Sequence, residues 1–231
     1  MSFKYDLHVH TKESSACAHN TGKEMAQFYK SLGYDGICIT DHFLNGNTTV
    51  PKDLSWAKQI EMFSKGYRNA KQEGEKIGLR VFFGWEYSYR GTDLLTYGLD
   101  KKWLLNHPDL LDYSINEYCE LIREEGGFIA QAHPFREADY IDMIRLLPRG
   151  VNAVEIINAS MTDFVNQRAA EYADNYELLK QAGSDAHAVD HKQYSGIKTT
   201  QAVNSLDKLL ELIKQEKIEV FLQQFNSEEV D

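Results

Sequence analysis

The sequence is short of the features that mark secreted and membrane proteins. It has only three cysteines, Cys17, Cys38 and Cys119, and this odd, widely spaced set favours reduced thiols in a cytoplasmic protein over a disulfide framework. No apolar run reaches the roughly 18 residues that a membrane-spanning helix needs. The first residues, MSFKYDLHVH, also lack the apolar core of a signal peptide. We therefore expect a cytoplasmic protein without membrane association.

Basic residues are scarce as well, with 25 Lys and Arg against 35 Asp and Glu and a net charge of −10. Long nucleic acids are held by Lys and Arg contacts to phosphates, so this balance disfavours such a partner. It is still compatible with a small phosphorylated substrate, because bound cations reverse the sign of the charge locally.

What the sequence does contain is an alternation of short apolar runs and segments with helical periodicity. Apolar residues make up 42% of the 231 residues, enough for a sizeable core, and we expect one domain over residues 1–231. The predicted strands are 3–10, 36–42, 79–87, 93–99, 128–133, 153–159 and 181–187. The predicted helices are 22–32, 54–78, 114–126, 137–147, 163–180 and 205–216. Such alternation is typical of an α/β fold with a largely parallel sheet, and its repetition favours a barrel.

Five of the eight histidines stand at the ends of these strands, together with carboxylates. The strand-end residues are His8 and His10, Asp41 and His42, Glu86, His133, and Asp185 and His187. In a parallel barrel these ends meet on one face, and residues i and i+2 of a strand point to the same side. Each motif alone fits an ordinary turn or strand exit, but their coincidence predicts a metal site. The mixed imidazole and carboxylate set suits Zn²⁺, Mn²⁺ or Fe²⁺, and Glu86 could bridge two ions.

The ordered motifs DLHVHT, ITDH, GWE, AHP and GSDAH resemble those of the PHP (polymerase and histidinol phosphatase) family of metal-dependent phosphoesterases. The resemblance spans nearly the whole chain. It implies a distorted (β/α)7 barrel with two or three divalent ions that activate a water for phosphoester hydrolysis. The first-ion ligands that it implies are His8, His10, Glu86 and Asp185. It further implies a second ion between Glu86 and His133, and a third held by His42 and His187.

The sequence departs from the family pattern at two places. The family usually has a histidine in the strand after the bridging glutamate, but here that strand reads GTDLLTYGL and offers only Asp93 as a ligand. The loop residue His107 is the alternative. A third-ion ligand usually follows the H-x-H pair closely, and here His19 is the best candidate and Glu13 the next. Cys17 could join a softer site, although an ordinary thiol is the favoured interpretation.

The resemblance also suggests how the reaction would proceed. Asp185 could accept a proton from water, and His187 or His42 could protonate the leaving group if it is free of metal. Arg136 could clamp a phosphate by a bidentate contact, or could equally form an ion pair with a neighbouring acidic residue.

Four polar residues near these motifs have less defined roles. Asp6 and Asp41 could orient metal-binding imidazoles through hydrogen bonds. Glu155 and Asn158 lie late in the predicted strand 153–159, where Asn158 could contact substrate. A structural role is favoured for both of these last two.

The expected substrate is a small phosphomonoester, of the histidinol-phosphate or nucleotide type. Hydrolysis of phosphodiesters or short oligonucleotides, or of phosphotyrosine, is an alternative use of the same centre. A catalytically inactive, metal-bound ligand-binding module is a further alternative, favoured only by the missing histidine in the strand 93–99.

Overall fold

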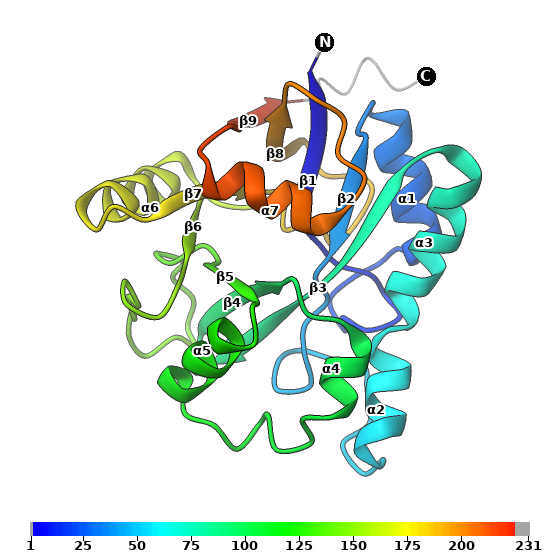
Figure 1. Cartoon of the computed structure of the whole chain (residues 1–231), viewed down its shortest axis with the longest axis vertical. Helices are drawn as coiled ribbons and strands as arrows, with labels where there is room; N and C mark the ends of the chain where they lie inside the picture. The colour runs from blue at the N-terminus through cyan, green and yellow to red at the C-terminus, as the bar shows by residue number, and fades with distance from the viewer. Residues whose placement is uncertain (1, 225–231) are drawn as a thin grey trace.

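One strongly curved sheet forms the centre of the protein in the computed structural model, which describes residues 2–224 (Figure 1). Its strand order is β7-β6-β5-β4-β3-β2-β1-β8-β9. The strands are β1 (Phe3–Val9), β2 (Gly36–Ile39), β3 (Arg80–Tyr89), β4 (Thr92–Tyr97), β5 (Phe128–Gln131), β6 (Ala153–Asn158), β7 (Leu179–Gly183), β8 (Gln193–Thr199) and β9 (Glu219–Gln224). A parallel bridge joins Val9, at the end of β1, to Ala186, just after β7. The sheet therefore curls almost into a closed barrel.

Helices cover the outside of this sheet (Figure 1). They are α1 (Gly22–Ser31), α2 (Trp56–Phe63), α3 (Lys65–Ile77), α4 (Lys101–Leu105), α5 (Ile115–Glu124), α6 (Asp163–Asn175) and α7 (Leu206–Lys214). A capping box formed by Ser114 and Glu117 is present at the start of α5. Such a box satisfies two backbone N–H groups that have no partner inside the helix.

The α/β, barrel-like fold is confirmed, but the sheet differs from the prediction in strand number and direction. Within residues 2–224 it has nine strands where seven were expected, because β8 and β9 were missed. Both run antiparallel to their neighbours, as β4 does to β3 and β5. Because β4 is reversed, its first residues lie beside the last residues of β3. Asp93 consequently pairs with Ser88, at the edge of the sheet where the parallel strands end.

Three predicted helices also need correction. The segment 54–78 forms two helices that meet at Ser64, where the serine hydroxyl donates to the Ile60 carbonyl and competes with the helical hydrogen bonds. The segment 163–180 is helical only to Asn175. The segment 137–147 is not helical. There the side chain of Gln131 forms hydrogen bonds with the backbone of the segment, because it donates to Arg145 O and accepts from Leu147 N.

The junction of α2 and α3 also supports the site. A side chain at Gly66 would place its Cβ only 1.8 Å from Thr11 Oγ1 and 2.8 Å from Asp41 Oδ2. Glycine thus lets α3 approach the residues that follow β1 and β2.

Among residues 2–224, no helix combines the length and the apolar character that crossing a membrane requires. The cytoplasmic location stays a prediction.

Candidate metal centre

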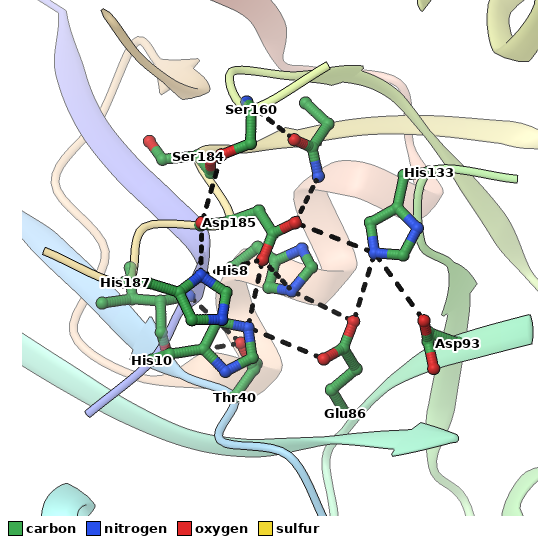
Figure 2. A network of polar contacts seen from close by, with 12 residues as sticks. His8, His10, Thr40, Glu86, Asp93, His133, Ser160, Ser184, Asp185 and His187 are labelled. Carbon is green, nitrogen blue, oxygen red and sulfur yellow. Dashed lines mark hydrogen bonds and ion pairs between the residues drawn. The ribbon is translucent and has the colours of Figure 1, made fainter. Parts of the chain in front are cut away.

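Seven residues of the H-x-H, DH, GWE, AHP and DAH motifs meet in one cluster. Figure 2 labels six of them, namely His8, His10, Glu86, His133, Asp185 and His187. Three overlapping groups of ligand-type atoms are present: His8, Glu86 and His133; His8, His10 and Asp185; and His10, His42 and His187. In each group the atoms lie within 4.8 Å of one another. The fold therefore gathers residues from β1, β2, β3, β5 and β7 or the turns after these strands.

Glu86 stands at the centre of this cluster and is fully buried. Its Oε1 lies 3.3 Å from the Nε2 atoms of both His8 and His133. Its Oε2 lies 2.5 Å from His42 Nδ1 and 3.6 Å from His10 Nε2. The two oxygens thus face different sets of imidazoles, as a carboxylate that bridges two ions must do.

Asp185 forms the second carboxylate of the cluster. Its Oδ1 lies 3.4 Å from His8 Nε2 and 3.2 Å from His10 Nε2, and its Oδ2 lies 3.8 Å from His133 Nε2. Asp185 has φ 53° and His133 has φ 25°. Both values are positive, and residues other than glycine adopt a positive φ only at a cost in free energy. Strained backbone of this kind persists where the surrounding structure holds a functional side chain in place.

Many buried polar atoms of the cluster have no hydrogen-bond partner within residues 2–224. They are Nε2 of His8, His10 and His133, Nδ1 of His42, and both carboxylate oxygens of Glu86. Their close contacts are ion pairs with one another, such as His42 Nδ1 with Glu86 Oε2, and gathering so many nitrogen and oxygen ligand atoms in the interior costs free energy that a bound cation would recover. Nitrogen and oxygen ligands at 2.0–2.2 Å from one ion lie about 2.9–3.5 Å apart, close to most of the separations found here. The residues therefore fit divalent metal ions.

Hydrogen bonds to the opposite side of the imidazole rings orient them toward this centre. His8 Nδ1 lies 2.9 Å from Glu155 Oε1, and His187 Nδ1 lies 2.9 Å from Asp185 O. With the proton on Nδ1 in each case, the Nε2 lone pair is free for a metal ion.

His10 is oriented in the same way through a serine. Its Nδ1 lies 3.1 Å from Ser15 Oγ, and that hydroxyl donates to Asp41 Oδ1. Asp41 thus acts on His10 through Ser15, in line with the prediction that it orients an imidazole. Asp6 instead accepts from the backbone N–H groups of His8 and Ser184 and from the Tyr29 hydroxyl, so it holds β1 against the end of β7. Within residues 2–224 it makes no hydrogen bond to an imidazole.

Sequence reasoning missed Ser15 as a supporting residue, and it favoured only a general structural role for Glu155, whose contacts to His8 and His133 it did not predict. Both oxygens of Glu155 are used, since Oε2 accepts from His133 N and from Asn158 Nδ2. The signal was a carboxylate inside the apolar strand AVEIIN, a position that requires a partner when it is buried.

The charges of the cluster set its pKa values. Burial would raise the pKa of Glu86, but His42 and His8 hold it well below its ordinary value. Burial would lower the pKa of His42, but the Glu86 carboxylate raises it to about 11. Burial and the neighbouring His187 both lower the pKa of His10 well below its ordinary value. Before ions bind, the cluster is therefore held together by imidazolium–carboxylate pairs.

The residues proposed for the less certain positions lie at different distances from the cluster. Asp93 Oδ2 is 4.0 Å from His133 Nε2, and burial raises the pKa of its carboxyl group. His19 is exposed and belongs to none of the three groups. Glu13 accepts from Gly22 N and Asn69 Nδ2, so its oxygens are occupied. The ring of His107 stacks on Trp103 at 3.9 Å.

Cys17, which the sequence favoured as an ordinary thiol, is half-buried and lies on the edge of the cluster. Its Sγ is 3.2 Å from His42 Nε2. Burial raises the pKa of the thiol, but hydrogen bonds with His187 and His42 lower it to about 6.

A cavity of about 540 Å³ opens over the cluster. Residues on its wall include Cys17, His42, Asp93, Arg136, Tyr140, Asp185 and His187. The guanidinium of Arg136 lies over the ring of Tyr140, 5.7 Å from its centroid. Within residues 2–224, Arg136 forms no ion pair with an acidic neighbour, so its positive charge remains available to a ligand in the cavity.

Comparisons with known proteins are consistent with this arrangement. The sequence matches the PHP domain family over residues 6–224, and no curated protein sequence matches it. The chain is similar to a two-domain protein from Bacteroides vulgatus that is described as containing a PHP-like metal-dependent phosphoesterase, with a TM-score of 0.71 and 14% identity. That likeness covers 96% of this chain and 65% of the other, so the chain spans less than two thirds of that protein.

Two further solved structures share the fold. One, from Bifidobacterium adolescentis, is described as a metal-dependent phosphoesterase, with a TM-score of 0.57, 17% identity, and coverage of 91% of this chain and 96% of that one. The other is an amidohydrolase from Chromobacterium violaceum with bound sulfate and no metal, with a TM-score of 0.58, 16% identity, and coverage of 97% and 99%. At these identities the likeness concerns the fold alone.

Proposed function

The chain belongs to the PHP domain family, and on that basis we propose that it is a metal-dependent phosphoesterase that hydrolyses a small phosphomonoester. The buried Glu86 carboxylate carries this proposal, because its two oxygens face different imidazoles and have no hydrogen-bond partner in the described chain. Such a carboxylate suits a centre of two or three ions, for which Zn²⁺, Mn²⁺ and Fe²⁺ are the candidates.

The cavity favours a small substrate. Its volume of about 540 Å³ lies within the range of roughly 300–1,000 Å³ that small-molecule sites occupy. Arg136 on its wall can bind two phosphate oxygens through its planar guanidinium group. A net charge of −10 disfavours a long nucleic acid. The substrate class that we propose is therefore a phosphomonoester of the histidinol-phosphate or nucleotide type.

Several residues would hold the ions. The first ion would be bound by His8, His10, Glu86 and Asp185. The second would be bound by Glu86 and His133, with Asp93 nearby. The third would be bound by His42 and His187. Bound divalent ions would neutralise phosphate oxygens and lower the pKa of a water molecule toward about 7.

Residues of the chain itself would carry out the remaining steps of the reaction. Asp185 lines the cavity, and we assign to it the acceptance of the proton from the attacking water. Arg136 would hold the phosphate in line with that water. His187 directs Nδ1 to the Asp185 carbonyl, so only its Nε2 remains, either to bind an ion or to protonate the leaving oxygen. These two roles exclude each other within one turnover.

A hydrolysis panel tests this proposal. Protein freed of metal with a chelator is reloaded separately with Mn²⁺, Zn²⁺ or Fe²⁺, and metal content is measured. Each form is then assayed with phosphomonoesters, phosphotyrosine, bis(p-nitrophenyl) phosphate and short oligonucleotides. We expect turnover of phosphomonoesters that is lost on chelation and restored by metal.

The other outcomes identify the alternatives. Preferential cleavage of the diester or the oligonucleotides would replace the phosphomonoester with a phosphodiester substrate. Full metal occupancy without turnover of any substrate would favour a ligand-binding module and refute the enzymatic proposal.

A further inference from the structure

The loop after β1 brings a thiol to the edge of the metal centre. Cys17 is half-buried and lies on the cavity wall, with its Sγ 3.2 Å from His42 Nε2. His42 Nε2 is in turn 3.5 Å from His187 Nε2. Around one tetrahedral ion with Zn–S at 2.3 Å and Zn–N at 2.0–2.1 Å, the ligand atoms lie about 3.3–3.6 Å apart. The Cys17–His42 and His42–His187 separations are thus close to those of neighbouring ligands of a single ion.

The imidazoles of this group present the correct nitrogen atoms. His42 turns its Nδ1 to Glu86 Oε2, which leaves Nε2 on the side of Cys17. His187 turns its Nδ1 to the Asp185 carbonyl, which leaves its own Nε2 toward His42. The ring of His10 stacks on that of His187 at 4.1 Å. His10 is fully buried, and its Nε2 has no hydrogen-bond partner in the described chain.

Backbone hydrogen bonds fix the position of the thiol. Ala16 N donates to Asn47 O at 2.8 Å, and Ala18 N donates to Ser15 O at 3.1 Å. His19 N donates to His187 O at 2.7 Å, which ties the loop directly to a residue of the cluster. The same loop leaves the His19 side chain exposed. Cys17, rather than His19, therefore occupies the position next to His42 and His187.

We infer that Cys17 is a thiolate ligand of the ion held by His42 and His187, a role that rests on the metal centre of the proposed function. A thiolate with two imidazoles favours soft or borderline ions such as Zn²⁺ and Co²⁺ over Mn²⁺ and Mg²⁺, which prefer oxygen ligands. The centre then contains two kinds of position. One is rich in carboxylates around Glu86 and Asp185, and the other is a nitrogen–sulfur position selective for zinc.

Cobalt substitution of the full chain tests this inference. A Co²⁺ ion bound by a thiolate absorbs in the near ultraviolet through charge transfer, whereas nitrogen and oxygen ligands give no such band. We expect the band in the cobalt-loaded wild type and its loss in Cys17→Ser. His19→Ala and Cys119→Ser, which change an exposed imidazole and a buried thiol of α5, should both retain it.

Zinc content provides a second readout, independent of turnover. After dialysis against a weak chelator, we expect Cys17→Ser to retain about one zinc ion fewer per chain than the wild type and His19→Ala. Zinc should also protect the Cys17 thiol from Ellman's reagent, and chelation should expose it.

Absence of the band in the cobalt-loaded wild type, or equal band and zinc content in Cys17→Ser, would overturn this inference. Loss of the ion in His19→Ala but not in Cys17→Ser would overturn it in favour of His19. A band without phosphoester hydrolysis would support the ligand role of Cys17 while refuting the proposed function, so the two failures are distinguishable.

Discussion

Replacement of Glu155 by glutamine should weaken metal binding even though this residue belongs to none of the three ligand groups. Glu155 is fully buried and accepts on both oxygens: Oε1 faces His8 Nδ1 at 2.9 Å, and Oε2 receives His133 N at 3.1 Å and Asn158 Nδ2 at 2.8 Å. The isosteric amide has only one accepting oxygen. In either orientation its NH₂ group must therefore face a donor.

The structure sets the size of the expected effect. If the amide nitrogen faces His8, the imidazole must move its proton to Nε2 and loses the lone pair that binds metal. If it faces His133 and Asn158, two buried donors lose their acceptor. Partners of ligating histidines are worth about 10–100-fold in metal affinity, or about 1.4–2.7 kcal/mol. A buried unpaired donor lowers the free energy of unfolding by a further ~1–3 kcal/mol.

A competition titration against a zinc-binding dye measures the affinity, and thermal unfolding of the metal-free protein measures the stability separately. Glu73→Gln is the matched control, because Glu73 is also a mostly buried carboxylate that accepts side-chain hydrogen bonds, here from Gln27 and Lys76, but it does not line the cavity. We expect the control to bind zinc as the wild type does. A Glu155→Gln protein with affinity within twofold of the wild type would refute this reasoning.

Three further predictions concern the same cluster. Asp185→Asn should abolish phosphoester hydrolysis while circular dichroism shows an intact fold, and near-wild-type turnover would contradict the role of Asp185. Gly183→Ala should lower the free energy of unfolding by about 1–3 kcal/mol and weaken metal binding, because the added Cβ would stand 2.4 Å from His8 Cβ; unchanged melting and metal content would count against this packing. Metal affinity should fall as pH falls, since ions displace protons from imidazoles whose pKa the carboxylates raise, to about 11 for His42. A pH-independent affinity measured by titration between pH 8 and pH 6 would contradict this sign.

The main features of the cluster could be predicted from the sequence because they follow from the geometry of strands. Alternate residues of a strand share a side, so the H-x-H motif alone placed His8 and His10 together. The ends of successive strands meet on one face, and this rule anticipated that Glu86 and Asp185 would lie near them. These residues are indeed within 3.6 Å of the two imidazoles.

The features that the sequence could not provide depend on tertiary structure. The thiol of Cys17 reaches His42 only because backbone contacts to Asn47 and His187 shape its loop, and no spacing rule encodes that path. The segment 137–147 has helical periodicity, but Gln131 binds its backbone at two points and prevents the helix. Strands β8 and β9 were missed because they carry no site motif and complete the sheet by antiparallel pairing.

Anomalous diffraction from crystals of zinc- and manganese-loaded protein tests most directly whether this cluster is a metal centre. We predict at least two anomalous peaks, with Glu86 between them and the Nε2 atoms of His8 and His133 at about 2.0–2.2 Å from an ion. Crystals of metal-loaded protein with no peak within the cluster, or with peaks only at surface residues, would contradict this claim.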